Sequence, residues 1–124
     1  MSLPLLLVED TPSLQAMFRT ILTGAGHDVR IASSAAEALA GFADSGTQVV
    51  LLDLMLPDRD GLDLMADLLA IRPETRVIVI TANASISRAV EAMRAGACDF
   101  LVRPFDDARF LGAVEKALSA NPSR

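Results

Sequence analysis

Apolar runs and helix-like segments alternate along the whole chain. Five stretches have the length and composition of short strands, and four of them are almost entirely apolar, as in strands buried on both faces of a sheet. The second stretch, residues 27–32, alternates apolar and polar side chains, which is typical of an edge strand with one solvated face. The four apolar stretches are residues 5–8, 49–53, 77–80 and 100–102.

The segments between these runs carry apolar residues at helical spacing and have local signals for helix ends. The N-terminal signals are capping side chains, a capping box and a proline in the first turn. They occur at Thr11-Pro12, Ser34 to Glu37, Asp60 and Asp106, while Pro73 and Gly96 mark helix ends. The helices predicted in this way cover about residues 12–24, 34–45, 60–72, 85–95 and 106–118.

Strands that alternate with helices predict an α/β protein with a parallel sheet and helices on both faces. The apolar runs of the first, third and fourth strands belong in the centre of this sheet and the alternating second strand at its edge. We therefore predict a flavodoxin-like, doubly wound sheet of five parallel strands in the order 2-1-3-4-5, with five helices. Residues 1–124 are predicted to form a single domain with a core at 4–119 and a short tail at 120–124.

Composition agrees with one globular domain of 124 residues, of which 52% are hydrophobic and 22% charged. No apolar run approaches the roughly 18 residues of a membrane span. The opening stretch is short and lacks a basic leader, so we interpret it as a strand and expect a cytoplasmic protein. Cys98 is the single cysteine, which excludes an internal disulfide. The net charge of −5 argues against nucleic-acid binding by this segment.

Acidic residues follow the two strands that flank the predicted switch in strand order. The first strand ends in Glu9-Asp10 and the third in Asp53. Ligands of open parallel sheets bind outside the carboxyl ends of the strands at this point. Three carboxylates this close together indicate a hard divalent cation, Mg²⁺ first. The simpler alternative is that each acid caps a helix or turn.

The next two strands end in Thr81 and Arg103. A hydroxyl and a cation beside a metal-bound carboxylate are suited to binding a phosphoryl oxygen. Taken singly, Thr81 could close a turn and Arg103 could pair with a surface acid. The convergence of four strand ends on one edge favours the site.

In combination, these motifs resemble the receiver domains of bacterial two-component response regulators. The resemblance extends from Leu5 to about Leu118. It rests on four segments: Val8-Glu9-Asp10, residues 53–61 (DLMLPDRDG), Thr81-Ala82, and residues 99–105 (DFLVRPF). Residues 84–97 further resemble receivers of the NtrC-type enhancer-binding activators.

The resemblance implies that Asp53 accepts a phosphoryl group from a phosphohistidine on a sensor histidine kinase or phosphotransfer protein. It further implies that Asp10, Asp53 and the backbone carbonyl of Met55 bind Mg²⁺, with Glu9 acting through a water molecule. Thr81 would then hydrogen-bond a phosphoryl oxygen. The chemistry expected is self-phosphorylation and autodephosphorylation, without turnover of an external substrate.

Two further positions follow from the resemblance. The small side chain of Ala82 leaves the site open to a donor, and Phe100 matches the switch aromatic that turns inward when Thr81 moves. An aromatic in a short apolar strand is also a common core residue, so the core interpretation of Phe100 stays open.

Arg103 departs from the family pattern, which has lysine before a proline whose peptide bond is typically cis. All basic residues except Lys116 are arginine, and Lys116 lies well inside the last predicted helix. A guanidinium keeps the charge but replaces a compact ammonium by a planar fork. It either engages the phosphoryl group, which we favour, or turns to solvent or a site acid and weakens activation.

The main alternative from another class is a receiver-like module that acts only as a protein-interaction surface, independently of phosphorylation. A phosphatase of the haloacid-dehalogenase type needs a second acid two residues after the nucleophile, where this chain has Met55. A flavodoxin proper needs a phosphate-binding loop after the first strand, where Glu9 and Asp10 would repel the flavin phosphate.

The output of such a switch is expected through the face of the fourth predicted helix, the fifth strand and the last helix, where a homodimer could also form. The chain is either a single-domain regulator or a fragment with an effector domain beyond Arg124. For the NtrC-type group that effector would be an ATPase and a DNA-binding domain, which predicts a role in transcription. Membrane association is not expected.

Overall fold

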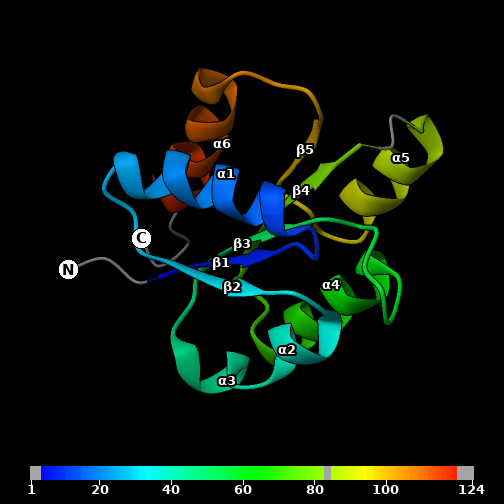
Figure 1. Cartoon of the computed structure of the whole chain (residues 1–124). Coiled ribbons are helices and arrows are strands. Elements are labelled where there is room, and N and C mark those ends of the chain that lie inside the picture. Colours follow the sequence, from blue (N-terminus) through cyan, green and yellow to red (C-terminus); the bar gives the residue numbers. More distant parts are fainter. Residues whose placement is uncertain (1–3, 83–84, 120–124) are drawn as a thin grey trace.

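The computed structural model describes residues 4–82 and 85–119. Five parallel strands form one sheet in the order β2-β1-β3-β4-β5, which confirms the predicted order (Figure 1). The strands are β1 (Leu5–Val8), β2 (Val29–Ala32), β3 (Val49–Leu52), β4 (Arg76–Thr81) and β5 (Asp99–Val102). The helices are α1 (Pro12–Gly24), α2 (Ala35–Leu39), α3 (Phe42–Ser45), α4 (Gly61–Ile71), α5 (Ile86–Arg94) and α6 (Asp107–Ser119).

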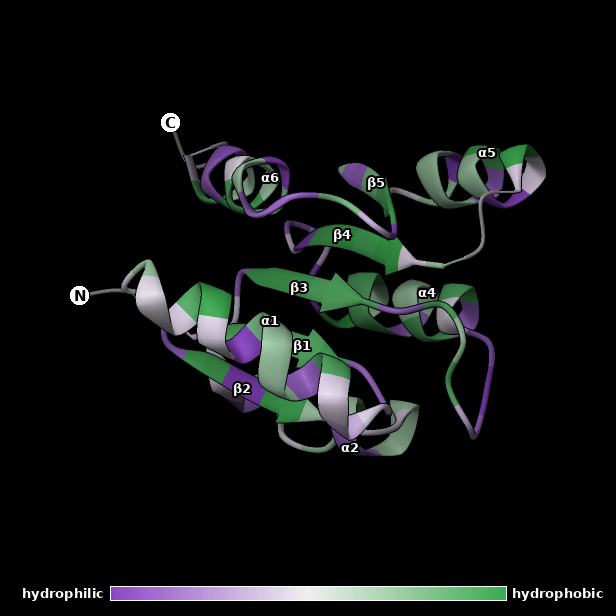
Figure 2. Ribbon diagram, turned by 45° about the horizontal axis from the view of Figure 1, so that its top comes forward, coloured by the Kyte–Doolittle hydropathy of each residue, from purple (hydrophilic) through white to green (hydrophobic). Residues whose placement is uncertain are grey.

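Alternate side chains of the central strands enter two separate cores, one on each face of the sheet. Leu5 and Leu7 of β1 pack with α1 and α6, whereas Leu6 and Val8 pack with the helices of the opposite face. β3 and β4 divide their side chains in the same way. Both faces of these strands are therefore buried, and Figure 2 shows them as hydrophobic ribbons between helices of mixed hydropathy.

The two helical layers differ in composition. On the face of α1 and α6, three phenylalanine rings form a cluster with centroid separations of 5.1 to 6.1 Å: Phe18, Phe105 and Phe110. On the other face the buried residues of α2, α3, α4 and α5 join one continuous cluster. These two layers fix the strands and hence the positions of the residues that follow them.

The prediction of five helices is wrong, because the second predicted helix is divided into α2 and α3. Ala40 has extended backbone angles and Gly41 a φ of 80°, in the left-handed region that favours glycine. The helix therefore ends at Leu39 and restarts at Phe42. Arg72 holds the second piece: its guanidinium donates to the carbonyls of Phe42, Ala43 and Thr47.

The predicted caps are confirmed at three of four helices. Ser34 Oγ accepts from Glu37 N at 3.1 Å, Asp60 Oδ1 from Leu62 N at 2.9 Å, and Asp106 Oδ1 from Arg109 N at 2.7 Å. Thr11 occupies the N-cap position of α1 without a side-chain capping bond, and its own N–H donates to Glu9 Oε2 instead. One acid predicted at the site thus binds the backbone of the N-cap residue.

None of the helices within the described ranges combines the length and the apolar character needed to cross a bilayer. The predicted tail at 120–124 and Ala84, part of the segment that resembles NtrC-type receivers, lie outside the described residues.

Candidate functional site

The acidic residues after β1 and β3 come together, as the sequence predicts. β1 and β3 are neighbours, and the N–H of Asp53 donates to the Val8 carbonyl at 3.0 Å. Glu9, Asp10 and Asp53 each offer one carboxylate oxygen, and these oxygens lie within 4.8 Å of one another. Glu9 and Asp53 are buried, whereas Asp10 is exposed. The site therefore has a buried base and an open side.

Both oxygens of Asp53 have defined partners. Oδ1 accepts from the backbone N–H of Met55 at 3.0 Å, and Oδ2 lies 3.4 Å from Nη2 of Arg103. The Arg103 side chain is 18% exposed, and its Nε is buried with no hydrogen-bond partner among the described residues. The guanidinium thus turns into the site and toward Asp53 rather than into solvent.

Glu9 is the acid with the unusual environment. Oε2 accepts from Thr11 N at 3.0 Å, while Oε1 is buried without a partner within the described part of the chain. A protonated Glu9 can donate to Asp53, and burial together with this hydrogen bond raises the pKa of Glu9 to about 7. Without a cation, Glu9 therefore favours its protonated form well above its ordinary pKa.

This donor set fits a hard divalent cation. The available ligand atoms are oxygens, which Mg²⁺ and Ca²⁺ prefer, and the unpartnered Glu9 oxygen lies among them. A cation would replace the proton on Glu9 and favour the ionised form of its carboxylate. The structure brings Met55 next to Asp53 through its N–H, and the side chain of Met55 is exposed.

The loop after Asp53 is held tightly against the start of α4. The N–H of Gly61 donates to the Leu54 carbonyl at 2.9 Å, and Met55 pairs with Asp60 in an antiparallel bridge. A Cβ on Gly61 would lie 2.5 Å from Cα of Leu54 and 2.9 Å from the carbonyl oxygen of Asp53. Gly61 is required here because the two backbone segments touch.

Thr81 and Arg103 also reach this edge of the sheet. Thr81 is the last residue of β4 and is buried, and its carbonyl accepts from Arg103 N at 2.8 Å. The peptide bond between Arg103 and Pro104 is cis, as the resemblance implies. The strand ends therefore place Thr81, Arg103 and Asp53 at the same edge of the sheet, and Ala82, which follows Thr81, is exposed.

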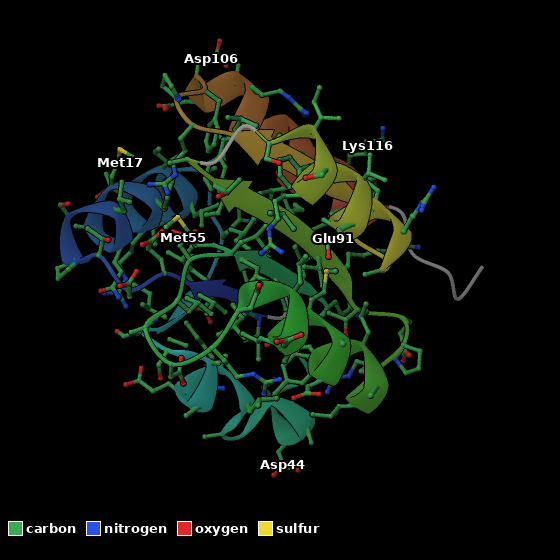
Figure 3. The ribbon with its side chains drawn as sticks, turned by 90° about the vertical axis from the view of Figure 1, so that its right-hand side faces the viewer. Met17, Asp44, Met55, Glu91, Asp106 and Lys116 are labelled. Carbon is green, nitrogen blue, oxygen red and sulfur yellow. The ribbon has the colours of Figure 1, made fainter. Side chains whose placement is uncertain are left out.

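Phe100 and Lys116 occupy more distant positions. Phe100 is partly buried and packs against the core cluster that contains the buried residues of α4. Lys116 lies on α6 and is well separated from Met55 of the site (Figure 3). Lys116 is therefore badly placed to supply the cation that Arg103 provides.

Two supporting residues were missed in the sequence. Gln15 of α1 donates through Nε2 to the Glu9 carbonyl and to Ser33 Oγ, which connects the acidic turn to the turn after β2. The carboxylate of Asp58 accepts from the N–H groups of Ala35 and Ala36 at 2.9 and 3.0 Å. These hydrogen bonds lower the pKa of Asp58. Neither pairing has a sequence signal, because the partners lie in different elements.

Comparisons with known proteins agree with this geometry. The sequence profile of the response regulator receiver domain matches residues 5–115. The luminescence regulatory protein LuxO of Vibrio campbellii is 38% identical over 112 residues, which are 90% of this chain and 25% of LuxO. The DNA-binding transcriptional regulator NtrC of Azospirillum brasilense is 32% identical over 94% of this chain and 24% of its own length.

Solved structures give the same result. A receiver domain protein (CheY-like) from Methanospirillum hungatei superposes with a TM-score of 0.91 and 28% identity, over 96% of this chain and 95% of that chain. The fold is thus that of response regulator receiver domains. The chain belongs to the response regulator receiver family, and its likeness to NtrC-type receivers is confirmed by LuxO and NtrC. It spans about a quarter of the length of these curated relatives.

Proposed function

We propose that this domain accepts a phosphoryl group on Asp53 from a phosphohistidine of a sensor histidine kinase or phosphotransfer protein. The observation that supports this most strongly is the environment of Asp53: a buried carboxylate beside Glu9 and Asp10, with the Arg103 guanidinium 3.4 Å from Oδ2. A structural cap or surface acid does not need both a cation and two further acids next to it.

In the transfer, a carboxylate oxygen of Asp53 attacks phosphorus, the P–N bond to imidazole breaks and a P–O bond forms. Asp10, Asp53 and the Met55 carbonyl would hold Mg²⁺ directly, and Glu9 would act through water. The metal supplies positive charge to the phosphoryl oxygens. Arg103 would add a second positive charge beside Asp53.

The same residues would make the domain a switch. Thr81 would hydrogen-bond a phosphoryl oxygen, and Phe100 would turn inward as Thr81 moves. The expected output face, formed by α5, β5 and α6, supports this proposal because α5 and β5 expose large apolar side chains there: Ile86, Val90, Met93 and Val102. Such a surface suits a second copy of the chain or an effector domain.

The names of the relatives support a proposal for the role of the whole protein. NtrC is a transcriptional regulator by name, so we propose that this receiver controls transcription through an effector domain of the ATPase and DNA-binding type. Residues 1–124 form a single receiver domain in this proposal, with no nucleic-acid contact of their own. The domain modifies itself and slowly hydrolyses its own phosphate, and its proposed kinase partner implies a cytoplasmic location.

Incubation with acetyl phosphate and Mg²⁺, followed by intact mass measurement, tests phosphorylation. We expect one added phosphoryl group on the wild type and none on Asp53→Asn. Equal labelling of Asp53→Asn would contradict the assignment of Asp53. No labelling of the wild type, together with absent Mg²⁺ binding, would favour an interaction module that works without phosphorylation.

Arg103→Lys separates the two roles considered for the arginine. If the guanidinium engages the phosphoryl group, restoring the family lysine changes the rate of labelling but leaves the domain able to switch. If Arg103 only neutralises Asp53, the lysine variant labels and switches better than the wild type. Chemical-shift changes of α5 on labelling measure the switching in both variants.

A further inference from the structure

The helix α5 is weakly anchored to the rest of the domain. Ala92 is the single buried residue in its described range, Ile86–Arg94. Its large apolar side chains point outward instead, with Ile86 81%, Val90 44% and Met93 48% exposed. Hydrophobic burial therefore contributes little to the position of this helix.

An ion pair supplies a second attachment. Nη2 of Arg88 on α5 lies 2.7 Å from Oδ1 of Asp60, at the end of the loop that follows Asp53. The hydrogen bond that Arg88 donates to Asp60 lowers the pKa of Asp60 and raises the pKa of Arg88. The Arg88 side chain is only 25% exposed, so the pair is partly shielded from solvent.

The Asp60 end of this pair is fixed. Asp60 caps α4 through Leu62 N and pairs with Met55 across the loop, and its neighbour Gly61 is in contact with the Leu54 backbone. The ion pair therefore joins a rigid part of the phosphoacceptor site to a helix that little else holds.

Arg88 has a second acid within reach on its own helix. Nη1 lies 3.3 Å from Oε1 of Glu91, three residues later, and Figure 3 shows Glu91 on the side of α5 turned toward α4. If α5 moves away from Asp60, Arg88 keeps a partner. The contact can open without leaving an unpaired guanidinium, as a reversible contact requires.

We propose that the Arg88–Asp60 ion pair is a latch, which holds α5 against the loop after β3 and opposes any displacement of α5 during switching. This inference rests on the proposed function for the switching itself, but the holding contact does not. Opening the latch makes α5 and its apolar face easier to reposition, so the domain becomes easier to activate.

Hydrogen exchange of the full chain tests the holding contact without any phosphoryl donor. Arg88→Gln and Asp60→Asn should each speed exchange in α5 by about two- to fivefold, the range expected for one partly exposed ion pair. Asparagine keeps the capping oxygen for Leu62 N, so α4 should be unchanged. The double variant should match the single variants, and Arg94→Gln is the matched control on the same helix.

Unchanged α5 exchange in Arg88→Gln, or additive effects in the double variant, would overturn the proposal. Binding of beryllofluoride with Mg²⁺ then tests the regulatory part. The apparent affinity should rise by up to the same factor in both latch variants and not in Arg94→Gln. Faster α5 exchange with unchanged or weaker beryllofluoride binding would refute the latch. If the wild type binds no beryllofluoride, the proposed function fails, and the exchange result alone decides the contact.

Discussion

Replacing Glu9 by glutamine should stabilise the metal-free domain at alkaline pH. The folded state raises the pKa of Glu9 from its ordinary value of 4.5 to about 7, mainly through burial. Each pKa unit corresponds to about 1.4 kcal/mol, so ionising Glu9 in the folded state costs roughly 3 kcal/mol. Glutamine removes this cost because it is neutral at every pH and can still accept from Thr11 N.

The direction of the pH dependence follows from the number of protons that the folded and unfolded states bind. Between the unfolded and folded pKa values the folded state binds more protons, so stability falls as pH rises through this window. Wild-type protein without metal should therefore lose about 2 kcal/mol from Glu9 between about pH 5.5 and pH 8. Glu9→Gln should lose none of this stability, because glutamine does not ionise. The free energy of unfolding of the variant should therefore exceed that of the wild type most at the higher pH.

Urea unfolding at both pH values, with and without Mg²⁺, measures the effect. Glu74→Gln is the matched control, because Glu74 is exposed and precedes the start of β4, whereas the site lies at the other end of that strand. Saturating Mg²⁺ should restore much of the wild-type stability at pH 8 and do less for Glu9→Gln. Equal pH dependence of wild type and Glu9→Gln in the absence of metal would refute the reasoning.

Two further substitutions test the backbone contact that holds the loop after Asp53 and the packing of the core on the face of α1 and α6. Gly61→Ala should destabilise by about 1–3 kcal/mol, because the added Cβ would lie 2.5 Å from Leu54 Cα. It should also weaken Mg²⁺ binding measured by calorimetry, and wild-type values for both would show that the loop is not held as described. Phe110→Ala should cost about 3–5 kcal/mol in urea unfolding, because Phe110 is fully buried between two other rings. A cost below about 1 kcal/mol would contradict this packing.

Strand order and the place of the site were predictable because both depend on short patterns. Runs such as residues 49–52 are apolar on both faces, whereas Arg30 interrupts the second strand and assigns it to the edge. Acids that follow neighbouring parallel strands must then lie close together, whatever conformation the following loops adopt. The prediction of Asp53 beside Glu9 needed only this topology.

Features that depend on contacts between distant residues were not predictable. Gly41 was the one signal for the break between α2 and α3, and the alanine-rich sequence around it favours a continuous helix. Thr11 looks like a side-chain cap, but the carboxylate of Glu9 takes its N–H. The Arg88–Asp60 pair joins residues 28 positions apart, and local propensity carries no information about it.

The central claim is that Asp53 is the residue that carries the phosphoryl group. Reductive trapping with borohydride after treatment with acetyl phosphate and Mg²⁺ converts an aspartyl phosphate to homoserine, and tandem mass spectrometry of the peptides then locates it. We expect homoserine at position 53, and none when Mg²⁺ is removed with a chelator. Homoserine at Asp10 or another acid, or equal trapping without Mg²⁺, would contradict the account.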